Sequence, residues 1–268
     1  MMRISEPAPA KLNLALHVRG KLPDGRHALE TVFAFCTDGD RLEAEPADDL
    51  SLGIQGPFAA GLWVQDNLVL RAAEALRAEA GVSAGARLSL TKNLPVSSGI
   101  GGGSADAAAA LRLLTRLWGT DPQWAVDLAP ALGSDVPACL LSLSARGTEA
   151  GDRLELIQDA VISGSPVLLV NPLVPLATGA VFAGWDGVDH GPLDDWRAGR
   201  NDLETAATRL IPAIGEVKGW LQTRSGASFV RMSGSGATCF ALFDGEEARD
   251  AAAADCPSDW WHLATFLR

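Results

Sequence analysis

The sequence predicts an α+β protein built from two domains. A chain of 268 residues with a hydrophobic share of 47% has enough apolar material for two cores of modest size. Segments with strand-like alternation are interleaved along the chain with segments of helical periodicity. The same mixture begins again after about residue 155 without repeating the sequence, so we expect domains at 1–155 and 156–268.

The first expected element is a strand at residues 11–19. Leu12, Leu14, Leu16 and Val18 share its apolar face, and the other face carries Lys11, Asn13, Ala15, His17 and Arg19. This alternation predicts a half-buried strand with Lys11 and Asn13 as neighbours, roughly 7 Å apart along its polar side. Asp24-Gly25 then marks a turn, and 29–45 predicts further strands.

Helices dominate the middle of the chain. Residues 67–80 predict a helix that Asp66 or Asn67 caps and Gly81 ends. After a strand at 87–91 and a glycine-rich turn, a second helix is expected at 104–118, with Ser104 as its cap. A third follows Asp121-Pro122, where proline suits the first turn, and ends at Gly133.

The second half predicts a similar mixture. The expected strands and helices are a buried strand at 167–170, a helical stretch at 202–222 interrupted by Pro212 and Gly215, strands at 229–232 and 238–243, a helix at 246–254 and a strand at 260–266. The uncharged stretch at 160–185 contains three prolines and three glycines, which break it, so we do not expect it to span a membrane.

The strongest functional signal is the glycine-rich segment at 95–108, Pro-Val-Ser-Ser-Gly-Ile-Gly-Gly-Gly-Ser-Ala-Asp-Ala-Ala. Four glycines between Gly99 and Gly103 let the backbone approach a ligand closely and turn its N–H groups inward. The helix that follows adds about half a positive charge at its N-terminus. We expect a site for a nucleotide polyphosphate, with a flexible turn as the alternative. No Walker A or G-x-G-x-x-G spacing is present.

Three further features are candidates for chemistry. Lys92, at the end of the strand before the loop, either reaches a nucleotide or is a solvated strand end. Asp135 is either an ordinary turn aspartate or a base that accepts the proton of an attacking hydroxyl, kept ionised by Lys11. Ser233-Gly234-Ser235-Gly236 is either a hairpin turn or a backbone wall that faces phosphates or substrate.

Charge and cysteine content exclude several classes. A net charge of −11 argues against broad binding to nucleic acids or anionic membranes, although a local site can still be positive. The four cysteines form no C-x-x-C pair, which makes zinc and dithiol chemistry unexpected. The first residues carry no apolar signal core, and we expect a reducing, cytoplasmic location.

Taken together, these pieces resemble the GHMP kinase superfamily. The resemblance rests on Pro-Ala-Lys-Leu-Asn-Leu at 9–14, the glycine-rich loop at 95–108 and Ser-Gly-Ser-Gly at 233–236. The pieces that resemble its diphosphocytidyl-methylerythritol kinase branch are Pro-Asp-Gly-Arg-His at 23–27, Asp66-Asn67-Leu68, Gly-Ser-Asp-Val-Pro at 133–137 and Asn201-Asp202. The resemblance covers essentially the whole chain.

The resemblance implies a fold and a reaction. The N-terminal domain would be like the second domain of ribosomal protein S5 and would bind ATP. The C-terminal, substrate-side domain would be ferredoxin-like, with the active site in the cleft between them. ATP, with Mg²⁺, would phosphorylate the 2-hydroxyl of a cytidine diphosphate-linked methylerythritol in the non-mevalonate pathway. Partners would be this small molecule alone, with no nucleic acid and no membrane, and the protein would be a monomer or a weak homodimer.

The resemblance also implies roles for particular residues. Lys11 and Asp135 would be the catalytic pair, and Asn13, Arg26, His27 and Phe182 would hold the substrate. The implied nucleotide contacts are Asn67, Lys92, Pro95, Val96, Ser97, Ser98, Gly99, Ile100, Gly101, Gly102, Gly103, Ser104, Ala105 and Asp106. The sequence names no set of metal ligands; Asp106 is one candidate, and it equally suits a nucleotide contact or the helix N-terminus.

One position departs from the family pattern. Arg26 stands where the family usually has a tyrosine that packs on the cytosine ring, and a guanidinium plane also stacks on a base. Two alternatives stay open. The first is another GHMP kinase that acts on homoserine, mevalonate or a sugar. The second is a non-catalytic nucleotide-binding protein on the same fold, which the presence of both Lys11 and Asp135 disfavours.

Overall fold

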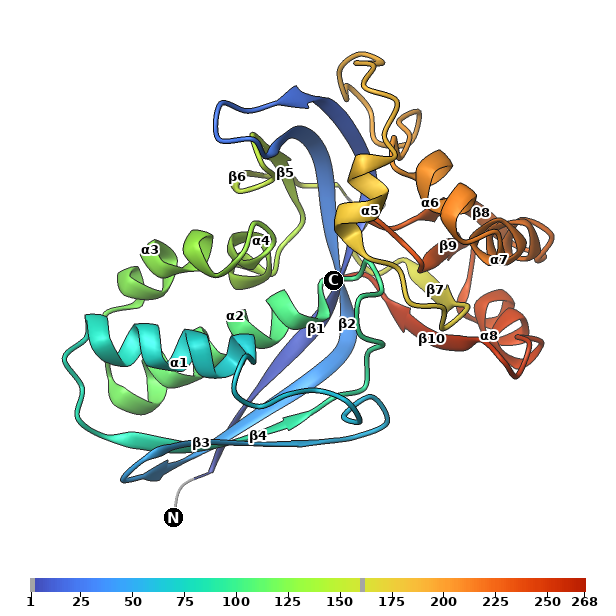
Figure 1. Cartoon of the computed structure of the whole chain (residues 1–268). Helices are drawn as coiled ribbons and strands as arrows, with labels where there is room; N and C mark the ends of the chain where they lie inside the picture. The colour runs from blue at the N-terminus through green and yellow to red at the C-terminus, as the bar shows by residue number, and fades with distance from the viewer. Residues whose placement is uncertain (1–2, 160–161) are drawn as a thin grey trace. The chain divides into compact units, whose positions relative to one another are not determined.

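The computed structural model describes residues 3–159 and 162–268 (Figure 1). They form two compact units, and neither unit is a continuous stretch of chain. Unit 1 holds the residues up to Ala10, Asp38–Val96 and Gly101–Ser142. Unit 2 holds Lys11–Thr37, Ser97–Ile100 and Leu143–Arg268. The division into domains at residue 155 stays a prediction. The two units are defined by contacts in space, whereas the predicted domains are continuous stretches of sequence.

Two long strands, β1 (Ile4–Lys21) and β2 (His27–Ala47), pair with each other and contribute residues to both units. In unit 1, residues 41–47 of β2 pair antiparallel with β4 (Gly85–Thr91), and β4 pairs parallel with β3 (Leu50–Gln55). The helices of this unit are α1 (Leu68–Glu79), α2 (Gly102–Trp118), α3 (Pro122–Leu132) and α4 (Val136–Leu141). Figure 1 shows α1 and α2 side by side over β3 and β4.

Helix α2 packs closely because its first turns carry little but alanine. Ala105 and residues 107–110 are each at most 1% exposed, so neighbouring backbones approach closely at this end of the helix. The expected Ser104 cap is wrong. The helix begins at Gly102, and the cap is Gly101 in the left-handed conformation, which places Ser104 inside the first turn. Asn67 does cap α1, since its Oδ1 accepts the N–H of Val69 at 2.9 Å.

Unit 2 contains a four-stranded antiparallel sheet in the order β10-β7-β9-β8. Its elements are β7 (Pro166–Asn171), α5 (Thr178–Ala183), α6 (Glu204–Leu210), α7 (Ala213–Gln222), β8 (Ala227–Met232), β9 (Cys239–Phe243), α8 (Glu246–Ala254) and β10 (Trp261–Phe266). This strand-helix-strand-strand-helix-strand arrangement confirms the expected ferredoxin-like fold. Residues 31–33 of β2 also pair with β5 (Ala145–Thr148), which pairs with β6 (Arg153–Leu156).

Several expectations about elements were wrong. Residues 29–45 form one continuous strand rather than several, and β3, α4, β5 and β6 were not anticipated. Gly215 lies inside α7 and does not interrupt it; a Cβ there would lie 3.3 Å from Thr208 Cγ2, so the glycine lets α6 and α7 pack closely. The strand at 11–19 is buried on both faces, because hydrogen-bonding partners cover its polar side.

The uncharged stretch at 160–185 contains β7, a loop and α5, while residues 160–161 lie outside the described residues. Within the described ranges, no helix combines the length and the apolarity that crossing a membrane requires.

Candidate active site

A hydrogen-bonded junction in unit 2 joins β1, the glycine-rich loop and the turn at 233–236. The Ser233 hydroxyl lies at its centre. It accepts a hydrogen bond from the backbone N–H of Asn13 at 3.1 Å and donates one to the carbonyl of Gly99 at 3.0 Å. The backbone N–H of Lys11 donates to the carbonyl of Ile100 at 2.9 Å. Three segments far apart in the sequence therefore meet in unit 2.

Glycine is required where the loop meets the turn. At Gly99, where φ is +76°, an added Cβ would lie only 2.5 Å from the carbonyl oxygen of Ser233 and 2.6 Å from that of Gly236. At Gly234, where φ is +54°, it would lie 2.8 Å from the carbonyl oxygen of Gly99. A side chain at either position would push the loop and the turn apart.

Lys11 and Asn13 are neighbours on β1, as the alternation predicted. The Lys11 Nζ donates to the Asn13 Oδ1 at 2.7 Å and lies 5.6 Å from the centre of the Phe33 ring. Lys11 and Asn13 are only 2% and 3% exposed. A charge-assisted hydrogen bond and an aromatic face therefore hold the ammonium group in place.

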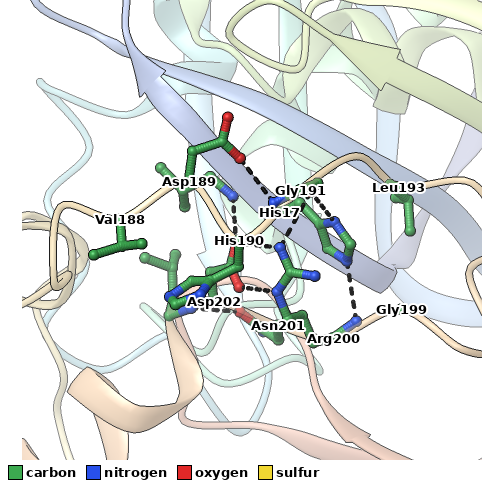
Figure 2. Close-up of polar contacts among 12 residues, drawn as sticks. His17, Val188, Asp189, His190, Gly191, Leu193, Gly199, Arg200, Asn201 and Asp202 are labelled. Carbon is green, nitrogen blue, oxygen red and sulfur yellow. Dashed lines mark hydrogen bonds and ion pairs between the residues drawn. The ribbon is translucent and has the colours of Figure 1, made fainter.

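The polar side of β1 continues to His17, which is 2% exposed (Figure 2). Its Nδ1 lies 3.1 Å from the carbonyl oxygen of Gly191, and its Nε2 lies 3.2 Å from the backbone nitrogen of Arg200. A carbonyl only accepts and an N–H only donates, so Nδ1 carries the proton and the ring is neutral. Burial lowers the pKa of His17, and the charge of Arg200 lowers it further.

Asn201 and Asp202 continue this network. The Asn201 Nδ2 donates to the carbonyls of Met232 and Gly234 at 2.8 Å each, so these two hydrogen bonds hold the start of the turn at 233–236 in place. Asp202 Oδ2 accepts the N–H of Val18 at 2.8 Å. The segment at 199–202 thus links β1 to the turn, and Figure 2 shows these side chains around His17.

A cavity of about 540 Å³ lies beside this network and is lined by residues of the 184–231 region, among them Trp185, Arg200, Asp202, Glu204 and Lys218. Its three acidic side chains are paired within the wall: Asp202 with Arg200 at 2.5 Å, Glu204 with Lys218, and Asp186 with His190 at 2.9 Å. None of the predicted site residues lines it. We therefore place the candidate active site at the junction around Ser233 and not in this cavity.

His27 and Phe182, predicted to hold the substrate, do come together. Their ring centres are 4.6 Å apart with planes tilted by 30°, and the Trp185 ring meets His27 edge-on at 5.7 Å. Burial lowers the pKa of His27, and the positive charge of Lys21 adds to the effect, which favours a neutral imidazole.

Helix α5 attaches this aromatic group to the junction. It carries Phe182, and the hydroxyl of Thr178 at its start lies 3.0 Å from the hydroxyl of Ser235 in the turn. The sequence prediction missed Trp185, which follows the end of α5 and donates its backbone N–H to the carbonyl of Phe182 at 3.2 Å.

Arg26 lies next to His27 and is about half exposed. Its Nε donates to Asp24 Oδ2 at 2.8 Å, and its Nη1 donates to Asp152 Oδ2 at 2.9 Å. Both bonds lie along edges of the guanidinium, so they fix the plane of the group and do not occupy its faces.

The remaining predicted residues belong to unit 1. They are Asn67, Lys92, Pro95, Val96, residues 101–106 and Asp135. Asp135 is the residue before α4 and does not cap it with its side chain. The loop therefore starts in unit 1, contributes residues 97–100 to unit 2 and returns. Residues 97, 99 and 101 all have positive φ, at 53°, 76° and 67°. Such alternation turns successive backbone N–H groups toward a concave side.

Lys92 is not a solvated strand end. Its Nζ donates to Asp40 Oδ2 at 2.5 Å and to Asp106 Oδ2 at 2.6 Å, and the three side chains are at most 5% exposed. Burial raises the pKa of Asp106 to about 7 against the attraction of Lys92. Burial alone would lower the pKa of Lys92, but the two carboxylates together raise it. Asp40 was missed, because a lone strand aspartate gives no sequence signal for a partner 52 residues away.

The chain is similar to known proteins along its whole length. Residues 67–142 match the GHMP kinases N terminal domain, and residues 189–260 match the GHMP kinases C terminal domain. A 4-diphosphocytidyl-2-C-methyl-D-erythritol kinase from Rhizorhabdus wittichii is 53% identical over 100% of this chain and 96% of its own length. The crystal structure of a 4-(cytidine 5'-diphospho)-2C-methyl-D-erythritol kinase superposes with a TM-score of 0.85 at 34% identity, covering 99% of each chain. The fold is shared with a homoserine kinase from Cytophaga hutchinsonii. That structure is 19% identical, has a TM-score of 0.71, and the match covers 98% of this chain and 95% of its own.

Proposed function

The chain belongs to the GHMP kinase family, and from this premise we propose that it transfers the γ-phosphoryl group of ATP to 4-diphosphocytidyl-2-C-methyl-D-erythritol. The acceptor would be the 2-hydroxyl and the product the 2-phosphate, as in the non-mevalonate route to isoprenoid precursors. The observation that carries this proposal is the full-length similarity to kinases named for that substrate. The grouping of Lys11, Asn13, the loop and the turn around Ser233 supports it.

The glycine-rich loop is the proposed phosphate site. Its alternating positive φ values and the N-terminus of α2 suit an anion whose oxygens accept backbone N–H groups. Lys92 already holds two carboxylates, so we assign it a supporting role: its Nζ lies beneath the first turn of α2, 3.0 Å from where a Cβ at Gly102 would be. Asn67, which caps α1, stays a proposed nucleotide contact.

Mg²⁺ would enter with ATP. Magnesium in kinase sites takes one or two carboxylates besides phosphate oxygens and water. The described residues contain no group of three His, Cys, Asp or Glu side chains suited to a metal, and this chemistry does not require one. Asp106 stays one proposed ligand, and its Oδ2 already accepts a hydrogen bond from Lys92 at 2.6 Å.

Phosphoryl transfer needs positioning and charge stabilisation more than covalent chemistry. We propose that Asp135 orients the acceptor hydroxyl and takes its proton, and that the Lys11 ammonium offsets the negative charge that develops on the transferring group. Lys11 is suited to this role because Asn13 and Phe33 fix its position. The two residues belong to different units, so their pairing is part of the proposal.

The cytidine end would bind at the aromatic group. His27, Phe182 and Trp185 offer ring faces and edges, and Arg26 offers a guanidinium face held flat by Asp24 and Asp152. Bases stack on both kinds of surface. Arg26 would thus replace the tyrosine of the family pattern.

A coupled ADP-release assay tests the proposal. The purified protein is given MgATP with 4-diphosphocytidyl-2-C-methyl-D-erythritol, and homoserine and mevalonate are tested in parallel. We expect ADP only with the cytidylyl substrate. Release only with another acceptor would keep the kinase and discard this substrate. ATP binding without release for any acceptor would favour a non-catalytic role.

A further inference from the structure

Thr31, on β2, is a residue that no motif singles out, and it lies beside the Lys11–Asn13 pair. It is 0% exposed. Its hydroxyl donates to the carbonyl of Ala15 at 2.6 Å and lies 2.8 Å from the Nδ2 of Asn13. All these residues belong to unit 2.

The donor and the acceptor of each hydrogen bond in the series Lys11–Asn13–Thr31–Ala15 follow from the groups involved. The Ala15 carbonyl can only accept, so the Thr31 hydroxyl spends its single proton there. Its lone pairs then accept from Asn13, which requires the NH₂ group of that amide to face Thr31. The carbonyl oxygen of the amide must consequently face the other way, toward the Lys11 ammonium at 2.7 Å.

The opposite amide orientation is unfavourable at both ends. It would direct the NH₂ of Asn13 at the Lys11 ammonium, so that donor meets donor, and its oxygen at a hydroxyl whose proton is used elsewhere. With Asn13 3% exposed and Lys11 2% exposed, water cannot compensate for either contact. The backbone of Asn13 is also held, because its N–H donates to the Ser233 hydroxyl. Gly234 packs tightly against the Asn13 side chain, since a Cβ at Gly234 would lie 3.1 Å from the Asn13 amide oxygen.

We infer that Thr31 is a positioning residue for phosphoryl transfer: it sets the Asn13 amide so that its oxygen holds the Lys11 ammonium in place. The inference rests on the proposed function, in which Lys11 acts on the transferring phosphoryl group. Without the Thr31 acceptor, the amide rotates or its buried NH₂ lacks a partner, and the ammonium loses its fixed position.

Thr31→Val tests this, with Thr31→Ser as the matched control. Valine keeps the shape and suits a strand but removes the hydroxyl, whereas serine keeps the hydroxyl. We expect Thr31→Val to lower kcat about 10- to 100-fold, the effect of losing one hydrogen bond to a charged group, with the KM for ATP little changed. Thr31→Ser should stay within about threefold of the unmodified protein, because the lost methyl group carries no hydrogen bond.

A double-mutant cycle with Asn13→Ala separates positioning from folding. If Thr31 acts through Asn13, Thr31→Val causes little further loss of kcat in the Asn13→Ala background. The inference would be overturned if the kcat losses of Asn13→Ala and Thr31→Val multiplied in the double variant. It would also be overturned if Thr31→Val and Thr31→Ser lowered kcat equally, or if Thr31→Val left kcat unchanged. Melting curves of all variants identify any that fail to fold.

A second readout does not depend on the substrate. In the ¹⁵N-labelled protein, the side-chain NH₂ resonances of Asn13 should shift in Thr31→Val and keep their positions in Thr31→Ser. Unshifted resonances in Thr31→Val would reject the inference even if the protein proved to act on another alcohol. A shift without any turnover would leave the amide orientation standing and reject the proposed function alone.

Discussion

At the scale of single residues, the proposed binding of the cytosine base depends on Arg26. Asp24 and Asp152 hold its guanidinium by the edges, and a face remains for a base. Removing a stacking side chain costs about 1–3 kcal/mol per base, so Arg26→Ala should raise the KM for the cytidylyl substrate roughly 5- to 150-fold. The KM for ATP should not change. Steady-state kinetics with either substrate varied measures both.

Arg153→Ala is the matched control for this prediction. Arg153 is exposed, begins β6 directly after Asp152 and is equally charged. It should leave both KM values unchanged. A wild-type KM in Arg26→Ala would show that the base does not stack there, and equal effects in both variants would point to charge alone.

Asp135 is the residue on which the proposed chemistry depends most. Asp135→Asn keeps the shape and removes the proton acceptor, so kcat should fall about 10²- to 10⁴-fold. The dissociation constant for ATP, measured by calorimetry without acceptor, should stay within about twofold since the phosphates are held elsewhere. Asp127→Asn on α3 is the control; its carboxylate accepts a hydrogen bond from Gln123 on the same helix. Near-normal kcat in Asp135→Asn would remove this residue from the role of base.

At the scale of elements, the start of α2 depends on the buried Lys92 pair. Lys92→Met would leave the carboxylates of Asp40 and Asp106 buried without their cation, which typically costs about 3–5 kcal/mol. Urea unfolding measures the loss. It should be smaller in mildly acidic than in mildly alkaline buffer, because protonating Asp106 removes one of the buried charges.

The double variant Lys92→Met/Asp106→Asn is the control for this element. It removes the cation together with one of the two charges it balances, so part of the lost stability should return. Asp40 keeps the N–H groups of Asn93 and Leu94, at 2.5 and 2.8 Å, as partners. No recovery would mean that Lys92 stabilises through packing of its hydrocarbon chain and not through charge.

The elements that the sequence predicts correctly are those set by local chemistry. Asn67 caps α1, Pro122 begins α3, and the alternating residues at 11–19 form a strand, because each of these signals lies within a few neighbouring residues. The failures depend on distant partners. Ser104 is not a cap because Gly101 takes the left-handed conformation first, and the polar face of β1 is buried because Thr31 and Gly191 bond to it.

At the scale of the whole molecule, the pieces of the site could be named from the sequence but their grouping could not. The glycine loop, Lys11, Asn13, His27 and Phe182 carry recognisable motifs. Unit 2 nevertheless combines three separate stretches of chain. Ser233, in the last of them, bonds to Asn13 and Gly99 in the other two, which lie 220 and 134 residues away. Thr31 and Trp185 contribute by contact alone, so only coordinates reveal them.

The stability of the whole molecule should depend on pH through His17. Its folded-state pKa lies below the ordinary 6.5, so the unfolded chain takes up the proton first as pH falls. The stability that neutral His17 contributes is therefore fully present above about pH 6.5 and is lost as pH falls toward the folded-state pKa. Protonation would also oppose the N–H that Arg200 donates to Nε2. Arg200 disfavours the imidazolium, whereas Asp202 and Glu30 favour it.

The net charge of −11 works in the opposite direction, because acidification reduces the self-repulsion of the folded chain. His27, also with a lowered pKa, and Asp106, with a raised one, contribute further, so the pH profile of one protein cannot isolate His17. The difference between two profiles can. Urea unfolding of the unmodified protein and of His17→Gln, over a pH series, should show the unmodified protein more stable by up to about 1–3 kcal/mol at neutral pH, as expected for two buried hydrogen bonds. That advantage should shrink steadily below about pH 6.5. A difference that stays constant across the series would mean that His17 does not titrate on unfolding and that its bonds to Gly191 and Arg200 confer no pH dependence.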